Sequence, residues 1–175
     1  MQTDQTIDTE PQRYPFFPVG VNDQQRIEFL HGLKVLDSTT EVEYEMVCRL
    51  AAIHFDMEIV NISLVDAERQ WFKSHLGLSA CETSRDVAFC NYTVLSDQIF
   101  EVLDASQDIR FQDNPLVKGE LSIRYYCGFP IVISGYTVGA FCLISSSARK
   151  DPLTAIEREF GTHCAALVAR MLEKR

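Results

Sequence analysis

The chain has 175 residues, of which 46% are hydrophobic and 23% charged, and its formal net charge is −9. This length is enough for one domain that buries a core without needing disulfides or a metal ion. The negative charge disfavours nucleic acid and anionic membrane surfaces as partners, so we expect neither.

Residues 1–21 are expected to be a disordered or extended tail, because a polar, acidic start leads into three prolines within eight residues. This start does not fit a signal peptide, and no apolar run approaches the roughly 20 residues of a membrane helix. We therefore expect a cytoplasmic protein whose folded domain comprises residues 22–175.

Two helices are expected in the first third of this domain. The first runs from Asn22 or Asp23 to about Leu33, and the second is opened by a capping box over residues 38–41. The apolar residues of the second helix are spaced by three and four and are expected to face the core: Met46, Val47, Leu50 and Ala51, with His54 as a partly exposed member at the end of the stripe.

Residues 58–66 alternate, with Val60, Ile62 and Leu64 on one face and Asn61 and Ser63 on the other, which predicts a strand. A short turn leads into a second strand over 69–74, so the two form an antiparallel hairpin. Further strands are expected over 99–103, 123–134 and 136–144. The connections over 79–95 and 104–119 are irregular, with a short helix over 87–92. Together these elements predict an antiparallel sheet flanked by helices, an α+β domain.

The last helix is predicted over 153–174, after a capping box of Thr154 and Glu157. Its apolar residues continue to the end of the chain, where Met171 and Leu172 are expected to extend past the sheet. Burying each such side chain contributes about 1.5–3 kcal/mol, so we expect a second chain to cover them in a homodimer. The interface residues expected are Leu167, Val168, Met171 and Leu172, with the helix of Val47 completing a four-helix bundle.

Six cysteines and four histidines are scattered along the chain without CxxC spacing or a second ligand close in sequence. We therefore expect reduced thiols, with no metal site and no cofactor. Cys90 and Cys127 are interpreted either as buried packing residues or as reactive thiols, and packing is the commoner role of buried cysteine.

A series of short motifs resembles the GAF domain family over roughly residues 22–174. The motifs are Leu36-Asp37, DAERQWFKS from Asp66, ETSR from Glu82 before Phe89-Cys90, DA from Asp104 before DIRF, DNPLV from Asp113, RYYCGFP from Arg124, and GAFC from Gly139. The subtype resembled is the bacterial one often found in front of diguanylate cyclase and histidine kinase modules. Where this subtype commonly has a histidine two residues after the cysteine of the FC motif, this chain has Tyr92.

The resemblance implies a six-stranded antiparallel sheet with the N- and C-terminal helices on one face and a loop-covered ligand pocket on the other. It implies a non-catalytic sensory domain in signal transduction, which binds an unidentified small molecule and acts on an output module in cis or in trans. Two alternatives are a cysteine-dependent reductase of free methionine sulfoxide, for which no catalytic residue is assigned, and a dimerisation module without a ligand.

The residues expected to contact the ligand are Phe89, Cys90, Tyr92, Arg110, Asn114, Arg124 and Tyr126. Arginine makes bidentate contacts to carboxylate or phosphate groups, which favours an anionic ligand. The alternative for Arg110 is an ion pair with an aspartate of its own loop. Arg124 is the better ligand candidate, because it is expected within a strand where burial would require a partner.

Overall fold

Six antiparallel strands form one sheet in the order β3-β2-β1-β6-β5-β4, in a computed structural model that describes residues 17–175. Of the tail predicted over residues 1–21, residues 1–16 lie outside the described residues. The strands are β1 (Ile59–Val65), β2 (Arg69–Leu76), β3 (Glu82–Ser84), β4 (Phe100–Val102), β5 (Tyr125–Ile133) and β6 (Tyr136–Ser145). The α+β sheet that the sequence predicted is confirmed, although β3 was expected to be irregular.

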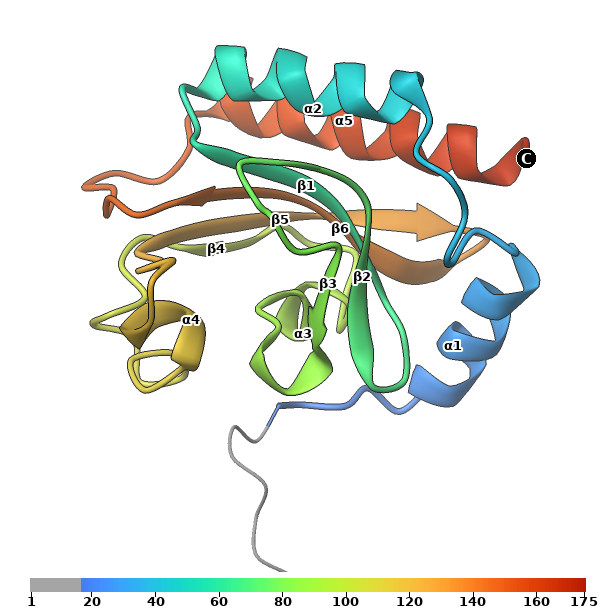
Figure 1. Cartoon of the computed structure of the whole chain (residues 1–175), viewed down its shortest axis with the longest axis horizontal. Coiled ribbons are helices and arrows are strands. Elements are labelled where there is room, and N and C mark those ends of the chain that lie inside the picture. Colours follow the sequence, from blue (N-terminus) through green and yellow to red (C-terminus); the bar gives the residue numbers. More distant parts are fainter. Residues whose placement is uncertain (1–16) are drawn as a thin grey trace, which may run out of the picture.

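The helices divide between the two faces of this sheet (Figure 1). The helices are α1 (Asp23–Gly32), α2 (Val42–Phe55), α3 (Cys90–Thr93), α4 (Pro115–Lys118) and α5 (Ala155–Glu173), with a 3₁₀ turn η1 (Arg85–Val87). The two long helices α2 and α5 lie side by side on one face, called here the helix face. The short helices α3 and α4 and their connections cover the opposite, loop face. The N-terminal helix of the GAF pattern is therefore α2, and α1 lies beside the β1–β2 turn.

Only one of the two predicted capping boxes is present. The amide of Glu157 donates to Thr154 Oγ1 over 3.3 Å and the amide of Thr154 donates to Glu157 Oε2, as predicted. The prediction of a capping box over residues 38–41 was wrong, because Glu41 itself is the N-cap of α2 and its side chain makes no capping hydrogen bond. Its carboxylate instead pairs at 2.7 Å with the ammonium group of Lys73, whose side chain is completely buried. A buried charge needs a partner, and this need outweighs the local cap.

The centre of the sheet is buried on both faces, since every residue of β1 is buried. Val60, Ile62 and Leu64 face α2 and α5 as predicted. The apolar stripe of α2 is displaced from its predicted position, however. Tyr44, Cys48 and Phe55 join Val47 and Ala51 in the core, whereas Met46 and Leu50 are 56% and 60% exposed, so the prediction that these two face the core was wrong.

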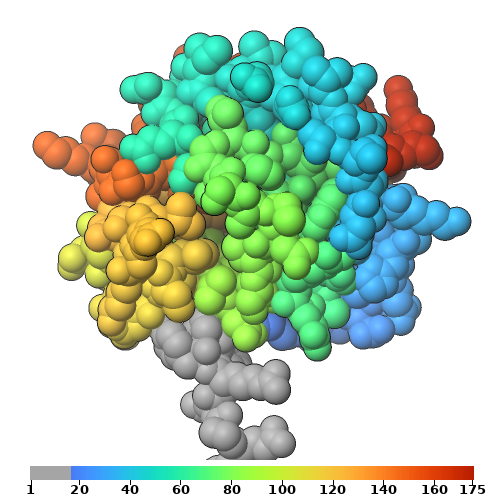
Figure 2. Space-filling model, viewed as in Figure 1, coloured from blue at the N-terminus to red at the C-terminus, as the bar shows by residue number. Residues whose placement is uncertain are grey.

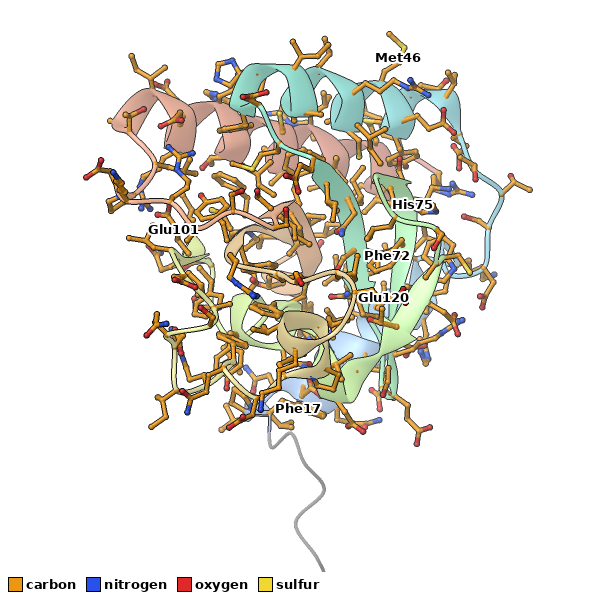
Figure 3. All side chains as sticks on the ribbon, turned by 60° about the vertical axis from the view of Figure 1, so that its left-hand side comes forward. Phe17, Met46, Phe72, His75, Glu101 and Glu120 are labelled. Carbon is orange, nitrogen blue, oxygen red and sulfur yellow. The ribbon has the colours of Figure 1, made fainter. Side chains whose placement is uncertain are left out.

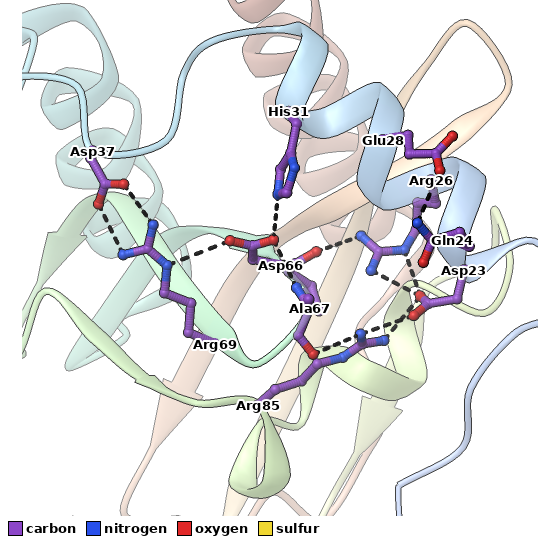
Figure 4. A network of polar contacts seen from close by, with 11 residues as sticks. Asp23, Gln24, Arg26, Glu28, His31, Asp37, Asp66, Ala67, Arg69 and Arg85 are labelled. Atoms are coloured by element: carbon purple, nitrogen blue, oxygen red, sulfur yellow. Dashed lines mark hydrogen bonds and ion pairs between the residues drawn. The ribbon is translucent and has the colours of Figure 1, made fainter.

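The DAER and ETSR motifs hold the β1–β2 turn against α1 (Figure 4). Arg26 of α1 donates to the carbonyl of Val65 over 2.5 Å, and Arg85 donates to the carbonyl of Ala67 over 3.3 Å. Both guanidinium groups bind Asp23. Burial raises the pKa of Asp23, but the hydrogen bonds and charges of the two arginines outweigh burial and leave the pKa lower than usual. These motif residues therefore support the fold.

Gly161 determines how closely α5 approaches the sheet. A Cβ atom added there would lie 2.1 Å from Cζ of Phe129 on β5. We expect Gly161→Ala to destabilise the domain by about 1–3 kcal/mol, because the overlap outweighs the roughly 1 kcal/mol that alanine gains over glycine in a helix. The measurement is urea unfolding, with Gly32→Ala as control because no atom lies within 4 Å of an added Cβ there. An equally stable Gly161→Ala variant would contradict this packing.

Candidate functional site

The loop face presents a patch of polar and sulfur-containing side chains at the centre of the sheet. Cys142 of β6 pairs with Asn61 of β1 on one side and with Gly128 of β5 on the other. Ser63 lies two residues further along β1 and is completely buried. The side-chain oxygen of Asn61 is buried without a hydrogen-bond partner among residues 17–175. The polar side chains that alternate along β1 therefore face a covered patch and not solvent.

Cys90, the first residue of α3, lies over this patch. Its Sγ is 3.3 Å from Sγ of Cys142 and accepts hydrogen bonds from the hydroxyl groups of Ser63 and Tyr126, both at 3.1 Å. The Tyr126 hydroxyl is also 2.9 Å from Oγ1 of Thr93. Gly128 is required beneath this last pair, since a Cβ there would lie 2.3 Å from Thr93 Oγ1 and 2.4 Å from the Tyr126 hydroxyl.

Aromatic rings close the patch from outside. Phe89 stacks on Phe111 with ring centroids 4.1 Å apart, and Tyr92 stacks on Phe100 at 5.3 Å. The ring of Tyr126 lies 5.1 Å from that of Phe89 and connects these rings to the patch. We call these five residues the aromatic cluster. Stacked and edge-on ring pairs contribute about 0.5–1.5 kcal/mol beyond their buried area, so the cluster stabilises a closed loop face.

The structure brings five of the seven predicted ligand residues together. Phe89, Cys90, Tyr92 and Tyr126 meet in the aromatic cluster and the patch beneath it. Arg110 lies over the rings of Tyr92, Phe100 and Phe111, 5.0–5.5 Å from their centroids. Its Nε also donates to Asp108 over 2.8 Å, so the alternative interpretation of a pair within its own loop is the observed one. This pair raises the pKa of Arg110 and lowers that of Asp108.

The other two predicted ligand residues support the loop instead. Asn114 accepts from the amide of Leu116 over 2.8 Å and so caps α4, while its Nδ2 donates to the carbonyl of Val87 over 3.0 Å. Arg124 precedes β5 and was wrongly placed inside a strand. Its Nη1 donates to the carbonyls of Val117 and Ile123 at 3.0 and 3.1 Å. Backbone carbonyls thus take the place of the anionic partner expected for Arg124.

Two hollows in the surface of residues 17–175 lie away from the predicted ligand residues. In the space-filling view the segments around residues 80 and 120 lie side by side (Figure 2). One hollow of about 330 Å³ is bordered by Asn22, Arg26, Leu95 and Thr137. Another, of about 480 Å³, is bordered by Asp37, Trp71, Lys73 and Cys81. The predicted ligand residues line neither of them.

Sequence reasoning missed Ser63, Thr93, Phe100, Phe111 and Cys142 as members of this site. The alternation of β1 already placed Ser63 on the side of the sheet opposite the apolar core. Cys142 ends the GAFC motif and Phe111 ends the DIRF motif. Ser63 and Cys142 are recognised as neighbours only when the pairing register of β1 and β6 is known. The sequence alone does not provide this register.

Glu101 connects β4 to the first turn of α5 on the helix face. Its carboxylate accepts from the Tyr125 hydroxyl over 3.0 Å and from the amide of Leu153 over 2.9 Å, and it also pairs with Arg158. Phe100, its neighbour in β4, belongs to the aromatic cluster on the opposite face. Because successive strand residues point to opposite faces, β4 links the loop face directly to α5.

The predicted dimer residues divide into two pairs. Val168 and Leu172 are buried in the core, with 0% and 1% exposure, so Leu172 does not extend past the sheet as expected. Leu167 is 48% exposed and Met171 is half-buried. On α2 the exposed apolar residues follow one stripe of the helix, and Figure 3 shows Met46 pointing away from the domain. The α2 stripe consists of Val42, Met46, Leu50 and Ile53.

Within residues 17–175 the histidine, cysteine, aspartate and glutamate side chains form no group of three suited to a metal ion. No helix in this part of the chain combines the length and apolar character needed to cross a membrane.

The family model of the GAF domain matches residues 35–172. A cyclic di-GMP phosphodiesterase of Pseudomonas aeruginosa is 35% identical over 152 residues, which cover 86% of this chain and 26% of that protein. The chain therefore spans about a quarter of the length of this relative.

Solved structures share the fold at low identity. The GAF domain of an Acinetobacter phosphoenolpyruvate-protein phosphotransferase superposes with a TM-score of 0.64 at 13% identity, covering 89% of this chain and 95% of that one. A type II free methionine-R-sulfoxide reductase from Thermoplasma acidophilum reaches 0.62 at 12% identity, covering 76% and 92% of the two chains. At these identities the likeness concerns the fold alone.

Replacing Phe111 tests whether the aromatic cluster holds the loop face closed. It is 2% exposed in the aromatic cluster, so Phe111→Ala is expected to lower the free energy of unfolding by about 3–5 kcal/mol. Ile109→Ala is the matched control, because Ile109 is 86% exposed in the same loop and its loss is expected to be nearly neutral. Chemical unfolding of the two variants measures the difference. A loss below about 1 kcal/mol for Phe111→Ala would show that the rings do not close this face.

Proposed function

We propose that this chain, which belongs to the GAF domain family, is a non-catalytic regulatory domain that binds a small molecule between its sheet and the covering loops. The observation that carries the proposal is the buried polar patch of Asn61, Ser63 and Cys142 beneath the aromatic cluster. Buried polar groups are costly unless they are paired, and the carbonyl oxygen of Asn61 has no partner within the described residues. Such a group is suited to a ligand that enters when the rings move aside.

The surroundings favour a small, uncharged, planar ligand. Hydroxyl, thiol and amide groups line the patch, and aromatic rings lie above it. Arg110 is already paired with Asp108, and Nη1 of Arg124 donates to backbone carbonyls, so a phosphate would have to compete with these contacts. An anion placed here would lose its hydration without gaining a counter-charge, which disfavours a nucleotide.

Signalling is proposed to run from the loop face through β4 to the helices. A ligand that separates Phe111 from Phe89 also displaces Phe100, whose neighbour Glu101 holds the start of α5. The ligand shifts this equilibrium only as far as it binds the open and closed states differently.

A homodimer through α2 and α5 completes the proposal. The α2 stripe is exposed by more than half at each of its four positions, and Leu167 of α5 is also exposed. Contact with a second copy would bury these side chains at about 25 cal/mol per Å² of apolar surface. Compared with the interface expected from the sequence, the proposed interface keeps Leu167 and Met171, omits the buried Val168 and Leu172, and adds the α2 stripe.

The output module is proposed to act in cis or in trans. The relative from Pseudomonas aeruginosa is named a cyclic di-GMP phosphodiesterase, and this chain matches only 26% of it. Control of cyclic di-GMP turnover is therefore the signalling context that we propose, with the chemistry performed outside residues 17–175.

A thermal-shift screen tests ligand binding. It compares neutral aromatic heterocycles with nucleotides and organic acids. A ligand at 100 times its dissociation constant is expected to stabilise the domain by about 2.7 kcal/mol. Tyr126→Phe, which removes a hydroxyl from the patch, is expected to weaken the shift. Tyr136→Phe is the control and is expected to leave it unchanged, because that ring stacks on Phe29 away from the loop face.

Two results would contradict the ligand proposal. The absence of any shift across the panel would favour the dimerisation module without a ligand. Turnover of free methionine sulfoxide that is lost on replacing a cysteine would favour the enzyme instead. The burial of Cys90 and Cys142 opposes that second outcome, since an attacking thiol must reach its substrate.

The dimer is tested by sedimentation at micromolar concentration. Met46→Glu combined with Leu50→Glu is expected to yield monomers of unchanged fold, because both side chains are already more than half exposed. Val21→Glu is the control, since Val21 is fully exposed on the approach to α1 and is expected to leave the dimer intact. A wild-type monomer at this concentration would rule out the interface.

A further inference from the structure

The fold brings the sulfur atoms of Cys90 and Cys142 close to one another. Their Sγ atoms lie 3.3 Å apart, and both residues are almost completely buried. A disulfide has an S–S length of roughly 2.05 Å, so a movement of little more than ~1 Å would join them. Cys90 belongs to the loop cover and Cys142 to the central strand β6. A bond between them would link these two layers.

The surroundings of Cys90 differ from those of the other buried cysteines. Two hydroxyl groups donate to its Sγ, and Thr93 lies behind Tyr126 in position to donate to the tyrosine oxygen. Burial raises the pKa of the Cys90 thiol, but the hydrogen bonds from Cys142, Ser63 and Tyr126 outweigh burial and lower it overall. Burial raises the pKa of Cys48 to about 11, and it also raises the pKa of Cys127. The thiolate is the nucleophilic form, so Cys90 is the buried cysteine best prepared to react.

We propose that Cys90 and Cys142 form an oxidisable dithiol, which a hydroperoxide such as hydrogen peroxide converts to a disulfide between the loop cover and the sheet. This proposal does not depend on the small-molecule ligand. Hydrogen peroxide is nearly as small as water, and local opening of α3, which has only four residues, admits it.

The reaction takes place in two balanced steps. The Cys90 sulfur attacks one peroxide oxygen, the O–O bond breaks, and the departing hydroxide takes the Cys90 proton to give water and a sulfenic acid. The Cys142 sulfur then attacks the Cys90 sulfur, the S–O bond breaks, and the second hydroxide leaves as water with the Cys142 proton. The two sulfur atoms lose two electrons in total, and the peroxide gains two.

Oxidation would hold the loop face in its closed form. Cys90 is adjacent to Phe89 of the aromatic cluster, and a covalent link from Cys90 to β6 restricts the movement of that ring. We therefore expect slower amide exchange over residues 85–93 in the oxidised protein. We also expect a ligand of the loop face to bind more slowly after oxidation.

The test treats the folded chain with hydrogen peroxide in a Cys81→Ser, Cys164→Ser background. These changes remove the exposed and the half-buried thiol, and Cys48, Cys90, Cys127 and Cys142 remain. Peptide mapping without reductant is expected to find the Cys90–Cys142 disulfide as the main product, while circular dichroism remains unchanged. Cys142→Ala in the same background is expected to leave Cys90 as a sulfenic acid that dimedone traps.

Tyr126→Phe tests the contribution of the hydrogen bond to Cys90 separately from the packing of the tyrosine ring. It keeps the ring beside Phe89 and removes one donor to Cys90, so the disulfide is expected to form about tenfold more slowly, in line with the loss of a hydrogen bond to a charged group. Tyr136→Phe, the control, is expected to react at the wild-type rate. The proposal is overturned if the folded protein forms no Cys90–Cys142 disulfide, if the disulfide appears only after denaturation, or if dimedone labels Cys48 or Cys127 in preference to Cys90.

Discussion

The burial of the sheet on both faces is the constraint on which the rest of the structure depends. Every side chain of β1 is covered, so its apolar and its polar positions each need a matching layer. The helices α2 and α5 supply an apolar layer over Val60, Ile62 and Leu64. Opposite them, the loops supply an aromatic layer over a polar patch. Because the two covers differ in chemistry, ligand binding is proposed for the loop face and association with a second copy for the helix face.

Strand β4 contacts both covers of the sheet. Phe100 belongs to the aromatic cluster and Glu101 holds α5, although the two are neighbours in sequence. Gly128 and Phe129 repeat this arrangement on β5, where Gly128 makes room for Thr93 and Tyr126 and Phe129 packs against Gly161. The same backbone therefore contacts both layers, and we propose that a change in one layer shifts the other.

Local patterns predicted the secondary structure well and the site only in part. The alternation over residues 58–66 and the Thr154 capping box are local features, and both were predicted correctly. The stripe of α2 was displaced because helical spacing alone does not say which of two adjacent stripes meets the sheet, and the sheet selects Val47 and Ala51 over Met46 and Leu50. Arg124 was expected to bind an anion but donates to backbone carbonyls of its own segment, whereas Arg110 forms the ion pair within its loop that the sequence had offered as the alternative. The contact between Cys90 and Cys142 joins residues 52 positions apart and depends on strand register, which no short motif encodes.

The central claim, that the loop face and α5 are energetically coupled through β4, is tested most directly by a double-mutant cycle. Phe111→Leu loosens the aromatic cluster on the loop face, and Arg158→Gln removes the ion pair with Glu101 on the helix face. The free energy of unfolding is measured for the two single variants and the double variant. Coupling predicts an interaction energy above about 0.5 kcal/mol, whereas effects that add within about 0.3 kcal/mol, as those of independent sites do, would contradict it.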